Sequence, residues 1–330
     1  MPKVFHQHEF VLLAILVGLC LVIGSVNPAF LEVDNLFGIL TSSVTPGILA
    51  LGALVVLISG NIDISFPSIA AFSLYVTTLL ATNLAVTDQI MLLLVISAAV
   101  GCLLGLVNAV LVHHARLPAL IVTLGTGSLI RGGLLAFIGT RIITDLPDSM
   151  IAFSKRTMWQ VHSEEGASVG LAVSVPIFLA LALLTHLILT RTMLGRGIYA
   201  LGGAPESARR VGFNIALIQL FIYGFMGFLA GLVGILHAAK MRNANPFDLA
   251  GLELNVIAAV VLGGASITGG RGTVLGTLLG VALLVVIGNS LLLVGLPSVW
   301  HKVATGLIII VSTGFTAWRG GLAPSTGGAS

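Results

Sequence analysis

The sequence predicts an all-α, polytopic membrane protein with about ten transmembrane helices. Hydrophobic residues make up 57% of the 330 residues and charged residues only 8%. A soluble domain of ordinary composition has about 25% charged residues, so most of the surface of this chain must face lipid. In lipid the backbone finds no water to bond, so only helices or closed barrels can cross. The apolar runs are long and uniform rather than short and alternating, which favours helices.

Charge-poor runs account for these spans, each near the roughly 20 residues that a transmembrane helix needs. They lie at 10–26, 37–59, 67–83, 90–112, 119–139, 171–190, 217–239, 253–270, 272–294 and 301–318. Together they fill the region 10–318, so we expect a single transmembrane domain over residues 1–330. An outer loop is expected at 140–170, and a flexible, glycine- and serine-rich tail at 320–330.

The placement of charge favours a cytoplasmic N-terminus. With that orientation, the inner segments are mainly basic and carry Lys3, Arg116, Arg191, Arg196, Arg209, Arg210, Arg271 and Arg319. The outer segments are mainly acidic, although they also hold Arg141, Lys155 and Arg156. Lys and Arg near span ends mark the cytoplasmic side. An even number of spans then places the C-terminus inside as well, and Trp300 and Trp318 bracket the last span like an aromatic belt.

Motifs for catalysis, nucleotide binding or metal binding are missing from the sequence. None of the four lysines stands in a G-x-x-x-x-G-K-[ST] phosphate loop, and no Cys/His metal spacing occurs. The adjacent His113 and His114 face different directions on a helix, so they do not share a metal. We therefore expect no enzymatic activity, no metal and no cofactor in this chain. The net charge of +3 does not argue for nucleic acid as a partner.

The polar segment 60–65, GNIDIS, interrupts two apolar runs. An aspartate near the end of a span is costly unless it is paired or wetted. Asp63 has two compatible interpretations. It is part of a gate or solute path, or it caps the next helix in a cytoplasmic turn, with Pro67 in the first turn. Segment 257–281 repeats the pattern of apolar helix, glycine-rich break and apolar helix, which in transporters is typical of the substrate site.

Arg131 stands near the middle of the expected span 119–139. An arginine at the bilayer centre costs about 2.5–3.5 kcal/mol on insertion scales, so it must face protein or water. It either binds backbone carbonyls at a helix break beside Gly132 and Gly133 or contacts the solute, and we favour the backbone carbonyls. The other polar residues expected along the transport path are Asn61, Asp63, Ser65, Asn108, Thr123, Thr126 and Asn255.

Small residues recur at every fourth position of three expected spans: Gly101 and Gly105, Gly227 and Gly231, and Gly272, Gly276 and Gly280. Such spacing lets helix backbones approach closely. We expect these contacts to form within one chain, with a seam between two copies as the alternative.

The hydrophilic segment 191–216 is rich in arginine and would lie on the cytoplasmic side. We expect it to form two short helices on the membrane surface. Pro205 suits the first turn of the second helix, where Glu206 complements the positive end of the helix dipole.

Four ordered segments follow recognisable motifs. GNIDISFPSIAAFS resembles G-G-I-D-L-S-V-G-S, and LPALIVTLGTGSLIRG resembles I-P-x-F-I-x-T-L-G-T…R-G. GRGIYALGGAPESARRVGFN matches G-R-x-x-Y-A-I-G-G-N…A-A-x-x-x-G-I. GLELNVIAAVVLGGASITGGRGTVLGTLLG matches E-L-x-A-I-A-A-V-V-I-G-G-x-S-x-x-G-G-x-G-x-x-x-G-T. Together they cover 60–281 and resemble the membrane permease subunits of bacterial ABC importers of the ribose type.

The resemblance implies a permease fold in the bacterial inner membrane and a set of partners. These are a second permease copy or a paralogue, a cytoplasmic ATPase that binds ATP and Mg²⁺, and a periplasmic binding protein that delivers a small-molecule solute. It also implies that segment 191–216 docks on the ATPase, through Arg196, Tyr199, Gly202, Gly203, Glu206, Ala208 and Arg209.

A monosaccharide or a sugar-like molecule is the solute that the resemblance implies. The sequence departs from the family pattern where Asn61 replaces Gly, Phe66-Pro67 replaces Val-Gly, and Ala204-Pro205 replaces an Asn-centred turn. Permeases for autoinducer-2 or for branched-chain amino acids are therefore alternatives. A second alternative, an ion-coupled secondary transporter, needs an intramembrane carboxylate, which only Asp63 approaches.

Overall fold

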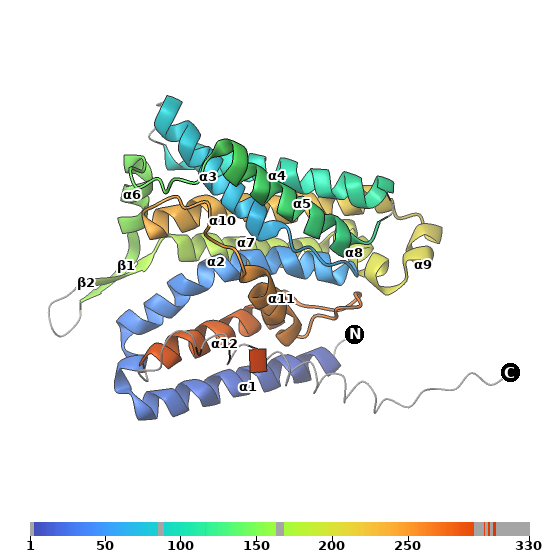
Figure 1. Ribbon diagram of the computed structural model, residues 1–330. Coiled ribbons are helices and arrows are strands. Elements are labelled where there is room, and N and C mark those ends of the chain that lie inside the picture. The colour runs from blue at the N-terminus through green and yellow to red at the C-terminus, as the bar shows by residue number, and fades with distance from the viewer. Residues whose placement is uncertain are drawn as a thin grey trace.

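The computed structural model describes residues 3–84, 89–115, 117–162, 168–293, 300, 303, 306 and 307 (Figure 1). Its elements, in chain order, are α1 (Lys3–Val26), η1 (Pro28–Leu31), α2 (Val33–Ile58), α3 (Phe66–Leu84), α4 (Ile90–Ala115), α5 (Ala119–Gly133), η2 (Leu134–Ile138), α6 (Asp148–Lys155), β1 (Thr157–His162), β2 (Ser168–Ala172), α7 (Ser174–Arg191), α8 (Met193–Gly203), α9 (Pro205–Arg210), α10 (Ile215–Met241), α11 (Leu252–Leu262) and α12 (Val274–Leu293).

Seven helices of the described part are long and apolar enough to cross a membrane: α1, α2, α4, α5 continued by η2, α7, α10 and α12. The apolar helices α3 and α11 are shorter. The all-α membrane class is confirmed, and each expected span up to residue 294 contains one of these helices. The last expected span at 301–318 lies mostly outside the described residues, as do Arg116, Arg319, Trp318 and the tail 320–330.

One expected span is wrong in its extent. The run 253–270 is not a single helix, because α11 ends at Leu262 and the chain is irregular from 263 to 273. Within this stretch Gly264, Gly269 and Gly270 all have positive φ, a conformation that other residues rarely adopt. The glycine-rich stretch thus makes a break with no helical turn of its own, and α12 begins only at Val274.

The helices α2 and α10 lie at the centre of the bundle. Every residue of α2 from Gly47 to Ile58 is buried, as expected for a helix that is apolar on all sides. Figure 1 shows α3, α4 and α5 on one side of this centre and α1 and α12 on the other. The core is therefore continuous from α4 through α10 and α2 to α12.

Glycines bring α4 and α10 into close contact. A Cβ atom on Gly101 would overlap the carbonyl oxygen of Gly227, and one on Gly231 would overlap that of Ser97. The Ser97 hydroxyl also donates a hydrogen bond of 2.6 Å to the Gly231 carbonyl. Gly276 and Gly280 pack in the same way against α11. These small-residue patterns therefore serve packing within one chain.

The two ends of the bundle differ. At one end lie α6 and an antiparallel hairpin of β1 and β2, in the region expected as an outer loop. Because β2 reaches Ala172, the span expected from 171 begins three residues later, at Ser174. At the opposite end α8 and α9 lie together with the start of α1 (Figure 1).

Candidate transport and coupling site

The first polar break joins α2 to α3 through residues 59–65. Gly60 turns the chain with a φ of 79°. The Asp63 carboxylate oxygen Oδ1 then accepts hydrogen bonds from the backbone N–H and the hydroxyl of Ser65, both at 2.7 Å. Such a local side-chain turn fixes the backbone just before a helix. Asp63 therefore shapes the turn before α3, although it bonds Ser65 and not an N–H of the helix itself, so its role as a cap stays a prediction.

Side chains from two other helices hold this break. The Asn108 amide on α4 donates a hydrogen bond of 2.7 Å to the Ser65 hydroxyl. On α5, the Thr123 hydroxyl accepts from the Ile64 N–H at 3.3 Å and donates to the Ile62 carbonyl at 3.4 Å. The break is thus tied to both α4 and α5.

The structure brings most of the expected path residues together, but it buries several of them. Asp63, Ser65, Asn108 and Thr123 are at most 3% exposed, and the Thr126 hydroxyl bonds the Thr123 carbonyl. Asn61 is half-buried, and its amide bonds the Ser59 hydroxyl at 3.1 Å. Asn255 lies on α11, and among the described residues no hydrogen bond links it to this group. A role in lining the path stays a prediction.

Burial changes the ionisation of Asp63, which lies between the two spans. Desolvation raises the pKa of its carboxyl, while the hydrogen bonds from Ser65 act in the opposite direction. Burial thus makes the charged form of Asp63 more costly than that of an exposed aspartate.

The second break meets the first at one end of α8. The Gly270 N–H donates a hydrogen bond of 2.8 Å to the Ile58 carbonyl, and a Cβ atom on Gly269 would lie 2.7 Å from the Cα of Gly60. A Cβ atom on Gly202 of α8 would overlap the same Ile58 carbonyl. We call Ile58, Gly60, Gly202, Gly269 and Gly270 the inner junction. It brings α8 into contact with both helix breaks.

The helices α8 and α9 present two different faces. Arg196, Gly203, Glu206 and Arg209 are exposed, whereas Ala208 is buried. The Tyr199 hydroxyl donates a hydrogen bond of 2.7 Å to the Gly272 carbonyl of the second break. The residues expected to dock on an ATPase therefore separate into an outer, charged face and an inner face that holds the breaks.

Arg131 lies on α5, two residues before that helix ends and the π turn η2 begins. It is half-buried and makes no hydrogen bond or ion pair with the described residues. Added Cβ atoms on Gly132 and Gly133 would meet nothing within 4 Å. The expectation that these glycines allow close backbone approach is therefore wrong within this chain. The neighbouring positions Gly125, Ser128 and Gly132 are exposed along the same helix.

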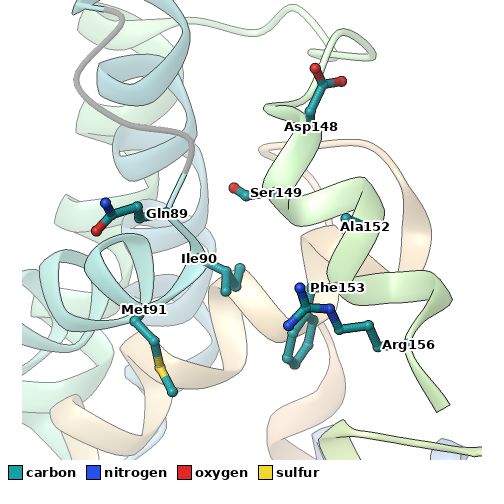
Figure 2. Close-up of a pocket in the computed structure, with 8 residues that line it drawn as sticks. All are labelled: Gln89, Ile90, Met91, Asp148, Ser149, Ala152, Phe153 and Arg156. Carbon is teal, nitrogen blue, oxygen red and sulfur yellow. The ribbon is translucent and has the colours of Figure 1, made fainter.

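The surface of the described chain has cavities, and two of them are well defined by their lining. Figure 2 shows one of about 460 Å³, between the start of α4 and α6, lined by Gln89, Ile90, Met91, Asp148, Ser149, Ala152, Phe153 and Arg156. The other, about 560 Å³, is an apolar groove between α4 and α10, next to Leu194 of α8. Neither contains an expected path residue. No cluster of side chains in the described part is suited to hold a metal ion.

Sequence reasoning missed Tyr223, a fully buried residue of α10 whose hydroxyl has no hydrogen-bond partner in the described part of the chain. Its signal was a single tyrosine in the mainly apolar run 217–239. That signal is weak, because the aromatic ring of tyrosine is at home among apolar side chains.

Several known permease proteins are similar to this chain over most of its length. The chain is 31% identical over 307 residues to the ribose import permease protein RbsC of Haemophilus influenzae, covering 93% of this chain and 91% of that protein. It is 33% identical to RbsC of Escherichia coli strain K12, covering 94% of each chain. It is 34% identical to the autoinducer 2 import system permease protein LsrC of Klebsiella pneumoniae, covering 94% of this chain and 86% of that protein. No solved structure matches the chain.

The family comparison covers most of the chain. Residues 35–313 match the family described as branched-chain amino acid transport system / permease component. The match and the relatives confirm the resemblance to the permease subunits of ABC importers. The chain belongs to this family of transport permeases.

Proposed function

We propose that this chain forms the transmembrane path of an ATP-driven importer for a monosaccharide or a sugar-like solute. The observation that carries the proposal is the inner junction, where one short surface helix, α8, touches both helix breaks. A partner that moves α8 would move both breaks together. The relatives that import ribose and autoinducer 2 support a sugar-like solute, with branched-chain amino acids as the alternative.

The chemistry of the described spans suits an uncharged solute. Apart from Asp63 and Arg131, the polar side chains along the expected path offer hydroxyl and amide groups, as a sugar requires. An ion-coupled transporter would need a carboxylate open to the ion. Asp63 is only 3% exposed, which favours the ATP-driven mechanism.

We place the path at a seam between two permease copies, along α5. A half-buried Arg131 without a partner among the described residues is costly if it faces lipid. The exposed Gly125, Ser128 and Gly132 share this helix, and small residues favour close approach of a second helix. The seam would supply Arg131 with water or with acceptors from the second copy.

The same arrangement supports an orientation in the bacterial inner membrane. The charged face of α8 and α9 would meet a cytoplasmic ATPase that binds ATP and Mg²⁺. The start of α1 shares that end of the bundle, so the N-terminus would be cytoplasmic (Figure 1). The opposite end, with α6 and the hairpin, would receive the periplasmic binding protein.

Uptake by reconstituted vesicles tests this function. The permease, its neighbouring ATPase and binding protein are placed in liposomes, and entry of labelled D-ribose, autoinducer-2 and leucine is measured. We expect uptake of the ribose or the autoinducer only with ATP on the ATPase side, and uptake unaffected by a protonophore. Uptake by the permease alone, driven by a proton or sodium gradient, would show a secondary transporter instead.

Arg131 gives a second prediction. We expect Arg131→Lys to leave the melting temperature of the detergent-solubilised permease unchanged, because the described chain supplies no acceptor that the planar guanidinium would lose. Uptake should fall about tenfold, as expected for the loss of one well-placed charged contact. A large fall in melting temperature with unchanged uptake would instead assign Arg131 to the backbone of its own chain.

A further inference from the structure

Three buried oxygen atoms around the first break have no hydrogen-bond partner among the described residues. They are Oδ2 of Asp63, Oδ1 of Asn108 and the hydroxyl of Tyr223. Asp63 is 3% exposed, and the other two residues are not exposed at all. Buried polar atoms without partners are rare because each costs free energy. Three such atoms on neighbouring elements indicate that some hydrogen bonds of this region form only in another arrangement of the break.

The three residues belong to one neighbourhood. Asp63 and Asn108 are both hydrogen-bonded to the Ser65 hydroxyl, each at 2.7 Å. A Cβ atom on Gly105, one turn before Asn108, would overlap the carbonyl oxygen of Tyr223. The Tyr223 side chain also lies within electrostatic range of the Asp63 carboxylate. The group thus joins the break, α4 and α10.

The roles of donor and acceptor in this group are unbalanced. The Ser65 hydroxyl already donates to Asp63 Oδ1, and the Asn108 amide donates to Ser65, so Asn108 presents its carbonyl oxygen. If Asp63 is ionised, its carboxylate cannot donate, and within this group the Tyr223 hydroxyl is the one donor left for the Asn108 carbonyl. If Asp63 carries a proton on Oδ2, the carboxyl supplies a second donor for that carbonyl.

In the described part of the chain, no cation offsets a charge on Asp63. Among the described residues it forms no ion pair with any Lys, Arg or His, and Tyr223 is the one other titratable group facing it. The elements packed around it contribute Ser65, Asn108 and Thr123, which are all neutral. A single buried charge without a partner is strongly unfavourable.

We propose that Asp63 is held as a neutral carboxylic acid whose Oδ2–H donates to the Asn108 carbonyl when the break closes on α4. This proton makes Asp63 a positioning residue that latches the first break. Because the inner junction ties the same break to α8, closing of the latch accompanies the movement of α8. The transport consequence rests on the proposed function, whereas the protonation does not.

Infrared spectroscopy tests the protonation directly. At neutral pH the purified permease should show the C=O stretching band of a protonated carboxylic acid. The band should be absent in Asp63→Asn and retained in the control Asp34→Asn, which changes an exposed acid at the start of α2. If the wild type lacks the band, Asp63 is ionised and the proposal is wrong, whatever the permease transports.

The pH dependence of stability supplies the second test. A carboxyl with a raised pKa binds its proton in the folded state, so its stabilising contribution is lost as pH rises through that pKa. The melting temperature should therefore fall as pH rises from the ordinary Asp pKa of 3.8 through the raised pKa, in the wild type and in Asp34→Asn, and this fall should be smaller in Asp63→Asn. An equal fall in all three would overturn the proposal.

Measurements of uptake distinguish a role for the hydrogen-bonding proton of Asp63 from a role for its negative charge. An asparagine at 63 keeps the shape and the donor of the neutral acid, so Asp63→Asn should transport within about twofold of the wild type. Asp63→Leu removes both, and uptake should fall at least about tenfold. A severe loss in Asp63→Asn with a normal melting temperature would mean that the charge itself is needed, against the proposal.

Discussion

Replacing Gly202 by alanine should uncouple ATP hydrolysis from uptake, whereas the same change at Gly203 should have little effect. A Cβ atom at position 202 would overlap the Ile58 carbonyl and would lie 2.6 Å from the Gly270 nitrogen. A Cβ atom at position 203 would meet nothing within 4 Å. The two substitutions are adjacent on α8 and chemically identical. A difference between them therefore reports the contact at Gly202 and not a general effect on the helix.

The expected loss follows from the rigidity of the inner junction. The overlapping atoms are backbone, which moves only with the breaks, and the hydrogen bond from Gly270 to Ile58 would be pushed apart. Overpacking of this kind typically costs about 1–3 kcal/mol, sometimes more. We expect Gly202→Ala to lower uptake at least about tenfold while the ATPase still hydrolyses ATP.

Uptake and ATP hydrolysis are to be measured together in proteoliposomes, with binding of the ATPase checked by copurification. Gly203→Ala should match the wild type in all three. If Gly202→Ala transports normally, or if both substitutions fail equally, α8 does not act through the inner junction.

The membrane class and most spans could be predicted because long apolar runs have few alternatives in lipid. The glycine-rich break within 257–281 was predicted too, but not where it begins: the expected span ran to residue 270, whereas α11 ends at Leu262, where the glycine conformations stop the helix. The hairpin of β1 and β2 was missed for a related reason. Its second strand merges into the apolar run at 171, and a strand of five residues carries little periodic signal.

The sequence pointed to the polar residues of the candidate site, but not to the contacts that their side chains make. A polar residue in an apolar run identifies Asn108 and Thr123, yet the sequence does not say which neighbour each contacts. Arg131 shows the opposite error, because the glycines beside it suggested close packing where the structure leaves open space. Gly202 and Gly203 look equivalent in sequence, and only the long-range contact with Ile58 distinguishes them.

The second large effect is expected at the interface of α4 and α10, from Gly227. A Cβ atom on Gly227 would overlap the carbonyl oxygen of Gly101, and the reciprocal change at Gly101 would overlap that of Gly227. In membranes this close approach of backbones supplies much of the packing between helices, since lipid provides no hydrophobic driving force. Gly227→Ala should therefore lower the stability of the detergent-solubilised permease by about 1–3 kcal/mol. Gly227→Leu should leave no folded protein.

Gly38 on α2 provides the control. It also lies in a long apolar helix, but an added Cβ atom there would meet nothing within 4 Å. Alanine favours a helix over glycine by about 1 kcal/mol, so Gly38→Ala should keep or raise the melting temperature. Thermal unfolding and size-exclusion profiles of Gly227→Ala, Gly227→Leu and Gly38→Ala make the comparison. If Gly227→Leu yields a monodisperse permease that melts like the wild type, α4 and α10 do not pack through these glycines.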